Sequence, residues 1–183
     1  MKPPENYRTV KQPKDMSICG ACLVAMITGL DLKLVQANMV YTNRDDRLYY
    51  KEKEIIEYLV SLGVYIGIRA IPLENPLHPD QNIEFKWPLK GNPAILAVKS
   101  KVYDDADHWV FWDGHHVRDS SWINKDETSK LQNYEVLEII PIFYSEDYDF
   151  IPPSGDKLHG KGCPCMSCTI IRMHNQRNNQ VPH

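Results

Sequence analysis

Residues 19–30 of the chain read CGACLVAMITGL, a run in which nearly every side chain is small or apolar. Such a run is typical of a helix that is buried on most of its faces, and here it predicts a helix that starts at Cys19. The partial positive charge at a helix N-terminus stabilises an anion, so it lowers the pKa of a thiol placed there. We therefore expect Cys19 to be a reactive cysteine at the start of a core helix.

The patterns that follow this run predict two more helices and then a series of strands. The helices are expected over residues 32–40 and 50–62, and Gly63 is expected to end the second. Strands are expected over residues 64–71, 93–98, 108–112, 115–119 and 135–144, with a proline-rich loop over 72–92. This order predicts an α+β fold in which N-terminal helices pack on an antiparallel sheet.

A hairpin is predicted at residues 112–115 (WDGH), because Asp-Gly between two β-prone runs favours a two-residue type I′ turn. That turn places residue 112 opposite residue 115 and, counting outward, His108 opposite Asp119. Directly opposed residues share one face of a sheet and have Cβ atoms about 4.5–5.5 Å apart. We therefore expect a hydrogen bond between His108 and Asp119. Asp107 neighbours His108 along the strand and is expected to point to the opposite face.

Four residues together supply what thiol-dependent acyl transfer requires. A cysteine attacks a carbonyl as its thiolate, and a histidine is the usual partner that keeps its pKa low. The imidazole needs a third group to orient it, and the tetrahedral oxyanion needs a hydrogen-bond donor placed in advance. The nucleophile, the base, the orienting carboxylate and the oxyanion donor are predicted to be, in that order, Cys19, His108, Asp119 and Gln12.

Two stretches resemble the papain-like cysteine peptidases, most closely the branch that includes the bacteriocin-processing, double-glycine-leader peptidase domains. They are residues 12–29 (QPKDMSICGACLVAMITG) and residues 108–119 (HWVFWDGHHVRD). The resemblance implies a papain-like fold and the same four roles for the residues named above. No Gly-Gly pair occurs in the chain, so the resemblance does not extend to leader processing.

Cys22 is the alternative nucleophile. The sequence Cys-Gly-Ala-Cys-Leu nearly matches the plant and lysosomal form of the motif, in which the second cysteine acts, but Leu23 interrupts the match. The oxyanion glutamine lies a few residues before the nucleophile in these enzymes, and Gln12 precedes Cys19 by seven residues and Cys22 by ten. This spacing favours Cys19 and leaves Cys22 as a buried helix residue.

The C-terminal segment, residues 151–183, differs in composition from residues 1–150. It has four Lys or Arg against one Asp, a net charge of +3, whereas residues 1–150 have 17 against 23, a net charge of -6. Its candidate ligands for a structural zinc ion are His159, Cys163, Cys165, Cys168 and His174. We predict a peptidase domain over 1–150 and a tail that either holds a structural zinc ion or is a flexible basic segment with reduced cysteines. The basic surplus of the tail could dock a partner or nucleic acid weakly.

Length and composition indicate one domain, with or without an appendage, in a reducing compartment. The 183-residue chain has a net charge of -3, which gives no reason to expect nucleic acid or an acidic membrane as the partner of the whole protein. Its first residues show no apolar h-region like that of a signal peptide, and no run approaches the roughly 18 apolar residues that span a membrane. Its five cysteines are unevenly placed and do not read as a disulfide framework. We expect a cytoplasmic protein.

The function predicted from the sequence is that of a cysteine peptidase or amidase that hydrolyses a peptide or isopeptide bond through a thioester. Catalysis is expected to need no cofactor, and the substrate is expected to be a protein or peptide. Two alternatives stay open. The same site could carry out deamidation or acyl transfer, since only the leaving group or the acceptor differs, or the domain could be an inactive papain-like binding module. Nothing in the sequence predicts the oligomeric state.

Overall fold

The computed structural model describes residues 1–14, 16–39, 42–44, 47–72, 75–78, 89–101 and 107–145, with the backbone alone over 42–44 and 47–49. Its helices are α1 (Cys19–Thr28), α2 (Leu32–Asn38), α3 (Glu52–Ser61) and the short 3-10 helix η1 (Leu131–Asn133). Its strands are β1 (Thr42–Arg44), β2 (Arg47–Tyr49), β3 (Val64–Ile66), β4 (Ala94–Lys99), β5 (Asp107–Trp112), β6 (Val117–Arg118) and β7 (Val136–Tyr144).

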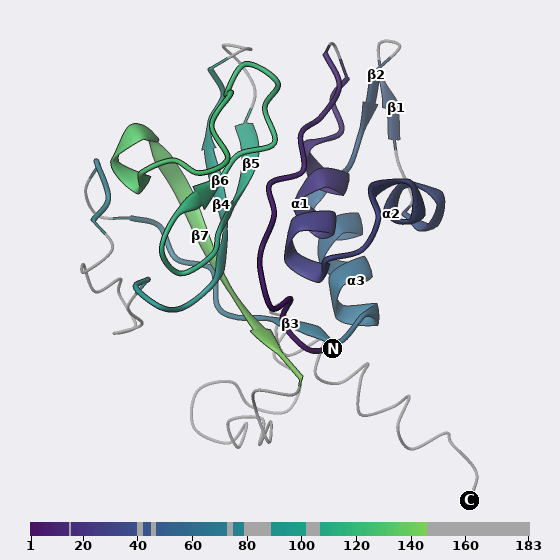
Figure 1. Cartoon of the computed structure of the whole chain (residues 1–183), viewed down its shortest axis with the longest axis horizontal. Coiled ribbons are helices and arrows are strands. Elements are labelled where there is room, and N and C mark those ends of the chain that lie inside the picture. The colour runs from purple at the N-terminus through teal and green to yellow at the C-terminus, as the bar shows by residue number, and fades with distance from the viewer. Residues whose placement is uncertain are drawn as a thin grey trace, which may run out of the picture.

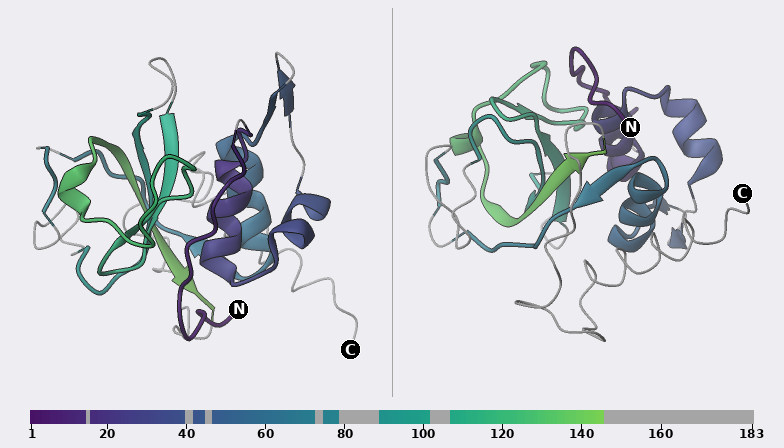
Figure 2. Two further views of the ribbon diagram at one scale, coloured as in Figure 1. Left: turned by 45° about the horizontal axis from the view of Figure 1, so that its top comes forward. Right: turned by 90° about the horizontal axis from the view of Figure 1, so that it is seen from below.

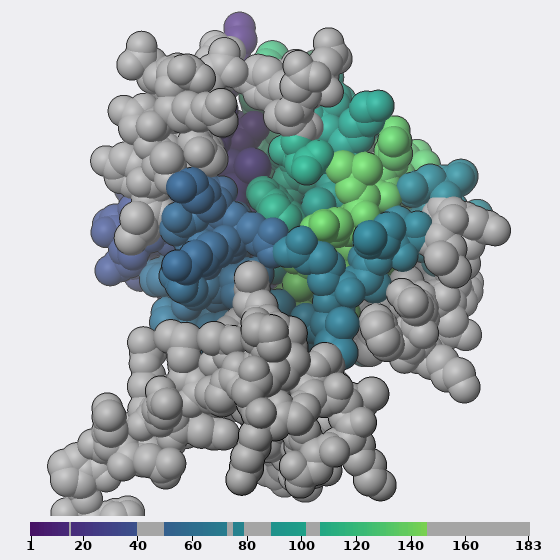
Figure 3. Space-filling model, turned by 180° about the vertical axis from the view of Figure 1, so that it is seen from behind, coloured from purple at the N-terminus to yellow at the C-terminus, as the bar shows by residue number. Residues whose placement is uncertain are grey.

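Five of these strands form one antiparallel sheet in the order β3-β7-β4-β5-β6. The helices α1 and α3 lie together on one side of it (Figures 1 and 2). From behind, the surface of α3 adjoins that of the sheet strands (Figure 3). The protein is therefore α+β, with helices first and an antiparallel sheet after them. The small antiparallel ribbon of β1 and β2 was not predicted from the sequence.

The helix α1 is the centre of the core, as its composition predicts. Every residue of α1 after Cys19 is buried, and its apolar side chains pack with Phe111 of β5 and Ile140 of β7. Gly20 permits this packing, because a Cβ atom there would lie 2.8 Å from Cδ1 of Ile55 on α3. The core thus fixes α1 against both α3 and the sheet, and with it the position of Cys19.

The other face of the sheet holds a second apolar cluster. Leu96 of β4, Val110 and Trp112 of β5 and Ile139 of β7 are buried there, and Tyr134 packs beside them. Because side chains alternate along a strand, successive residues of β4 and β5 point alternately into one apolar cluster and the other. The sheet is therefore buried on both faces, which holds β5 rigidly between two cores.

The N-terminal segment, residues 1–14, runs alongside α1 in the opposite direction (Figures 1 and 2). It forms no helix or strand. The ring of Tyr7 meets that of Phe111 edge-on at 4.9 Å between centroids, and the Tyr7 hydroxyl lies 3.1 Å from that of Tyr144. These contacts pack the segment against β5 and β7, and its end lies beside the loop that follows β6.

The predicted register of the hairpin is wrong. Trp112 pairs with Val117 instead of residue 115, and Phe111 pairs with Arg118, so the register is shifted by two residues. The loop is longer than predicted because the Asp113 carboxylate accepts hydrogen bonds from the backbone N–H groups of residues 115 and 116 and from Arg118 Nε at 2.7 Å. An even shift keeps His108 and Asp119 on the same face of the sheet.

Other predicted strands are longer than those in the structure. The strand predicted over 64–71 ends at residue 66, although Ala70 still bridges to Ile139, and the one predicted over 115–119 is reduced to β6. The domain boundary predicted at residue 150 lies outside the described residues. No single helix in the described ranges is long and apolar enough to cross a membrane; α1 and α2 reach that length and composition only together, and the chain bends by 117° between them.

Candidate active site

Cys19 is the first residue of α1, and the residue as a whole is intermediate in exposure. Burial works to raise the pKa of its thiol, but the hydrogen bond and charge of His108, together with backbone hydrogen bonds from Trp109 and Gly20, lower this pKa below its ordinary value. Ile18, which precedes the helix, provides no side-chain cap, so the first N–H groups of α1 are not used by a cap. Cys19 therefore lies where a thiolate is stabilised.

His108 on β5 connects Cys19 to Asp119. Its Nε2 atom lies 2.6 Å from Asp119 Oδ1, so the predicted contact between the two residues is present despite the shifted register. His108 also interacts with the Cys19 thiol and lowers its pKa, and since Nε2 faces Asp119, Nδ1 is the ring nitrogen left for the sulfur. Burial lowers the pKa of an imidazole, but Asp119 and Cys19 outweigh it and raise the pKa of His108 to about 9. The opposite shifts favour a thiolate and imidazolium pair at neutral pH.

The carboxylate of Asp119 is 5% exposed and meets hydrogen-bond donors at both oxygens. Oδ1 accepts from the N–H group of Ser121 at 2.8 Å as well as facing His108. Oδ2 accepts from the Tyr134 hydroxyl at 3.0 Å and lies 3.4 Å from Asn124 Nδ2. Burial raises the pKa of a carboxyl, but the hydrogen bond and charge of His108 and the other donors hold the pKa of Asp119 well below its usual range. Asp119 therefore stays ionised.

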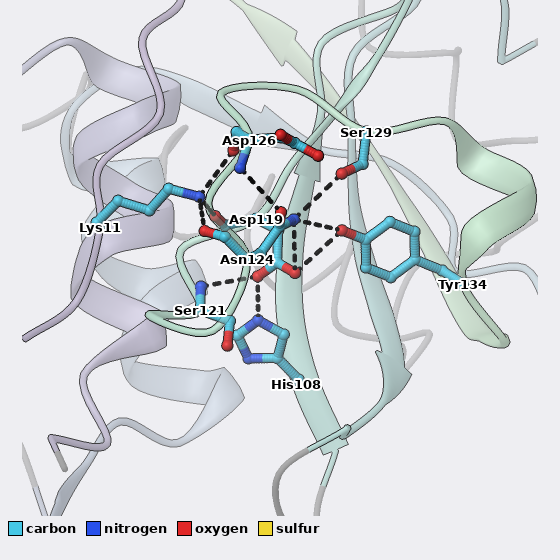
Figure 4. A network of polar contacts seen from close by, with 8 residues as sticks. All are labelled: Lys11, His108, Asp119, Ser121, Asn124, Asp126, Ser129 and Tyr134. Atoms are coloured by element: carbon cyan, nitrogen blue, oxygen red, sulfur yellow. Dashed lines mark hydrogen bonds and ion pairs between the residues drawn. The ribbon is translucent and has the colours of Figure 1, made fainter. Parts of the chain in front are cut away.

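A second layer of side chains fixes this carboxylate from behind (Figure 4). Asn124 Nδ2 lies 3.1 Å from Ser129 Oγ and 3.2 Å from the hydroxyl of Tyr134. Burial, followed by the charge of Asp119, raises the pKa of Tyr134, so the phenol stays protonated and remains a donor. Asp119, which orients the imidazole, is thus itself held by a network that includes Asn124, Tyr134 and Ser129.

Replacing Tyr134 with phenylalanine is expected to destabilise the protein by about 1–3 kcal/mol, because it removes a donor from a buried carboxylate. Asp119 keeps its charge in this variant, so alkylation of Cys19 at pH 7 should slow by less than about tenfold. Urea unfolding and iodoacetamide kinetics measure the two effects. The matched control is Tyr7→Phe, which removes the hydroxyl contact with Tyr144. Equal destabilisation by both variants would contradict the prediction.

Lys11 ties the N-terminal segment to the loop that carries Asp119. Its ammonium group donates to the backbone carbonyls of Asp119 at 2.9 Å, Asn124 at 2.7 Å and Asp126 at 2.9 Å (Figure 4). An ammonium group has three donors, and here each has an acceptor. Burial lowers the pKa of Lys11, and nearby carboxylates oppose the shift. The loop is therefore closed around the side of Asp119 that faces away from His108.

Gln12 follows directly, and its backbone N–H donates to the carbonyl of Ser120 at 2.9 Å. The side chain is half-buried, and its Oε1 atom is buried without a hydrogen-bond partner among the described residues. The structure thus places Gln12 beside the residue that follows Asp119. Its predicted role as oxyanion donor stays a prediction.

Cys22, the alternative nucleophile, is fully buried in the core cluster around α1. Burial, followed by the charge of Cys19, raises the pKa of Cys22 to about 12. Such a thiol is protonated at neutral pH and is a poor nucleophile toward a carbonyl. The surroundings of the two sulfurs therefore favour Cys19, in agreement with the spacing from Gln12.

The candidate zinc ligands of the C-terminal tail lie outside the described residues, so the zinc site stays a prediction. Within the ranges that the structure describes, no group of three or more His, Cys, Asp or Glu could hold a metal ion. Asp107, the other carboxylate next to His108, is exposed. The polar contacts around His108 thus come from Asp119.

Sequence reasoning did not identify the residues that support the site, namely Lys11, Ser121, Asn124, Ser129 and Tyr134. Their positions show no motif, and only the adjacency of Lys11 to Gln12 hinted at a role. Comparison of the chain with models of known protein families and with curated proteins found no match. The proposal below therefore depends on the geometry and on the residue types at the site.

Proposed function

We propose that the protein is a papain-like cysteine peptidase or amidase with Cys19 as its nucleophile. The observation that carries the proposal is the continuous set of contacts from Cys19 through His108 to an ionised Asp119. A buried carboxylate that holds one imidazole nitrogen while the other faces a thiol at a helix start is what activation of a cysteine requires. The order of helix-borne cysteine and strand-borne histidine also supports a papain-like fold.

In the proposed mechanism the Cys19 thiolate attacks the carbonyl carbon of a peptide or isopeptide bond. The backbone N–H of Cys19 and the amide of Gln12 hold the oxyanion. The imidazolium of His108 donates its Nδ1 proton to the leaving amine, which departs and leaves a thioester on Cys19. The neutral imidazole then takes a proton from water, whose oxygen attacks the thioester and regenerates the thiolate and the imidazolium. Asp119 remains ionised throughout and orients the ring.

The proposal predicts that iodoacetamide at pH 7 alkylates one cysteine of the full-length protein rapidly and stoichiometrically. Peptide mapping should place the label on Cys19, because its thiol has a lowered pKa and the residue is partly exposed. Cys22→Ala should keep the rapid labelling and Cys19→Ala should lose it. Slow and equal labelling of all five cysteines would overturn the proposed site.

Gln12→Ala separates the oxyanion role from activation of the thiol. Alkylation by iodoacetamide forms no oxyanion, so its rate should stay unchanged. Acylation by an activated ester such as p-nitrophenyl acetate should slow by about 100-fold, the effect of removing one oxyanion donor. Gln132→Ala, which alters a glutamine outside the site, is the control. Equal losses in both reactions would show that Gln12 supports the structure of the site instead.

The products distinguish hydrolysis from the related reactions. Incubation with protein or peptide mixtures should yield cleaved peptides in which one water has been added across the bond. Conversion of side-chain amides to acids, or transfer to an added amine, would assign the same site to deamidation or acyl transfer. Rapid labelling of Cys19 without any acyl chemistry would favour the binding module.

A further inference from the structure

Cys19 and Cys22 occupy the first and fourth positions of α1, where residues one turn apart lie on the same side of a helix. With a rise of about 1.5 Å per residue and a Cα radius of about 2.3 Å, their Cα atoms lie about 5 Å apart. That separation is within the range of roughly 4.4–6.8 Å that a disulfide spans. The charge of Cys19 contributes to the pKa of Cys22, so the two sulfurs are also electrostatic neighbours.

The two thiols differ in their surroundings. Cys19 is partly exposed and stabilised as a thiolate by His108, whereas Cys22 is 0% exposed and packed in the apolar core. Oxidants react with thiolates that they can reach, so a peroxide would select Cys19. Cys22 is shielded from the oxidant and can react only with a sulfur that is already beside it.

We propose that Cys19 and Cys22 form a redox modification site, in which a peroxide oxidises Cys19 and Cys22 traps the product as a reversible disulfide. This inference rests on the reactive thiolate of the proposed function but does not depend on hydrolysis of any substrate. It assigns Cys22 a role that the acyl-transfer site does not use. The modified protein has no thiolate at Cys19 and is inactive until a thiol reductant restores it.

The chemistry balances with hydrogen peroxide as the oxidant. The Cys19 thiolate attacks one peroxide oxygen, the O–O bond breaks, and the hydroxide that leaves takes a proton from the His108 imidazolium to become water. The sulfur is thereby oxidised by two electrons to a sulfenic acid. The Cys22 sulfur then attacks the Cys19 sulfur, the S–O bond breaks, and the departing hydroxide takes the Cys22 thiol proton, giving a disulfide and a second water.

The first turn of α1 is where such a bond is least costly to close. Cβ atoms three residues apart on a helix are about 5–6 Å apart, and a disulfide needs roughly 3.5–4.5 Å, so the turn must tighten. The N–H groups of residues 19–21 precede the first helical hydrogen bond, which Cys22 N–H makes to the Ile18 carbonyl at 3.1 Å, so tightening the turn strains this terminal bond before any other of the helix. A strained disulfide is easily reduced, which suits a reversible modification.

The test is differential labelling of the full-length protein after exposure to a molar excess of hydrogen peroxide, enough to supply the two equivalents that a sulfinic acid requires. Free thiols are blocked with iodoacetamide, the protein is reduced, and the newly freed thiols are labelled with N-ethylmaleimide. We expect both cysteines of the peptide between Lys14 and Lys33 to carry N-ethylmaleimide, and rapid alkylation of Cys19 to return fully after reduction. This readout requires no substrate.

The variants identify the partner of Cys19. In Cys22→Ala the sulfenic acid has no adjacent thiol, so a second peroxide should oxidise Cys19 to sulfinic acid, and its alkylation should not return on reduction. A variant with Cys163, Cys165 and Cys168 all replaced by serine should behave as the wild type. A disulfide from Cys19 to one of these tail cysteines, or equal recovery in the wild type and Cys22→Ala, would overturn the proposal.

Failure of this inference is distinguishable from failure of the proposed function. If Cys19 of the untreated protein labels slowly at pH 7, the proposed catalytic site is wrong. If Cys19 labels rapidly but peroxide yields sulfinic acid without N-ethylmaleimide on Cys22, only the redox site is wrong. Should Cys22→Ala not fold, the labels on the wild-type peptide still decide the question.

Discussion

His108→Asn is expected to slow alkylation of Cys19 at pH 7 by up to about 30-fold, because an ordinary thiol is only a few per cent ionised at that pH. In the wild type the hydrogen bond and charge of His108 lower the pKa of Cys19, so a larger share of the sulfur is thiolate than in an ordinary cysteine. Hydrolysis should fall further than alkylation does, since the variant also lacks the group that protonates the leaving amine. Iodoacetamide kinetics between about pH 5 and 10 measure the first effect.

The wild type and His108→Asn should also differ in how their alkylation rates change with pH. The alkylation rate of the wild type should level off at a pH below the usual pKa of cysteine, whereas that of His108→Asn should rise through the usual value. Hydrolysis by the wild type should decline as the pH rises through about 9, where His108 loses its proton. His116→Asn, which replaces an exposed histidine of the β5–β6 loop, is the matched control. Alkylation of His108→Asn at the wild-type rate would exclude His108 as the activating group.

Asp119→Asn is expected to have the second-largest effect, a loss of about 100-fold or more in the acyl-transfer rate. The carboxylate only accepts hydrogen bonds, and donors face both of its oxygens. The amide of asparagine has one acceptor oxygen and one NH2 donor where the carboxylate has two acceptor oxygens. Its NH2 group therefore faces another donor, which is either the Tyr134 hydroxyl or the N–H groups of Ser121 and His108. The pKa of His108 should fall, because burial then acts without the opposing carboxylate.

Stability should change in the same variant. Breaking this buried pair is expected to cost about 2–4 kcal/mol in urea unfolding at pH 7. Because the pKa of Asp119 is depressed, its contribution to stability is present above its unfolded pKa of about 3.9 and is lost as the pH falls toward the folded value. Asp119→Asn should lack that acid-dependent loss. Asp107→Asn, at the exposed neighbour of His108, is the control, and equal effects of the two variants would contradict the prediction.

The helices were predictable because their signals are local. The apolar run after residue 19 leaves a helix no exposed face, and α1 begins at Cys19 as expected. Gly63 has a φ of 82° and follows α3 directly after Leu62, in agreement with its predicted role as a helix stop. The β1–β2 ribbon escaped prediction, because its sequence is short and charged and shows no alternating pattern.

The register of the hairpin could not be predicted from the local sequence. Asp-Gly favours a two-residue turn, but the Asp113 side chain bonds two N–H groups of the loop and Arg118, and this stabilises a longer loop. A slip of one residue would have put His108 and Asp119 on opposite faces. The slip is two residues, so the predicted contact forms from diagonal positions instead of opposed ones.

The sequence by itself determined the α+β order of the elements, the start of α1 at Cys19 and the residue types needed for a cysteine nucleophile. These depend on side-chain periodicity and on the chemistry of single residues, which need no distant contact. Only the tertiary structure decided the register of His108 with Asp119, the burial that separates Cys22 from Cys19, and the support of Asp119 by Lys11 and Tyr134. Those features depend on desolvation and on hydrogen bonds between residues up to 108 positions apart, which exist only after the chain has folded.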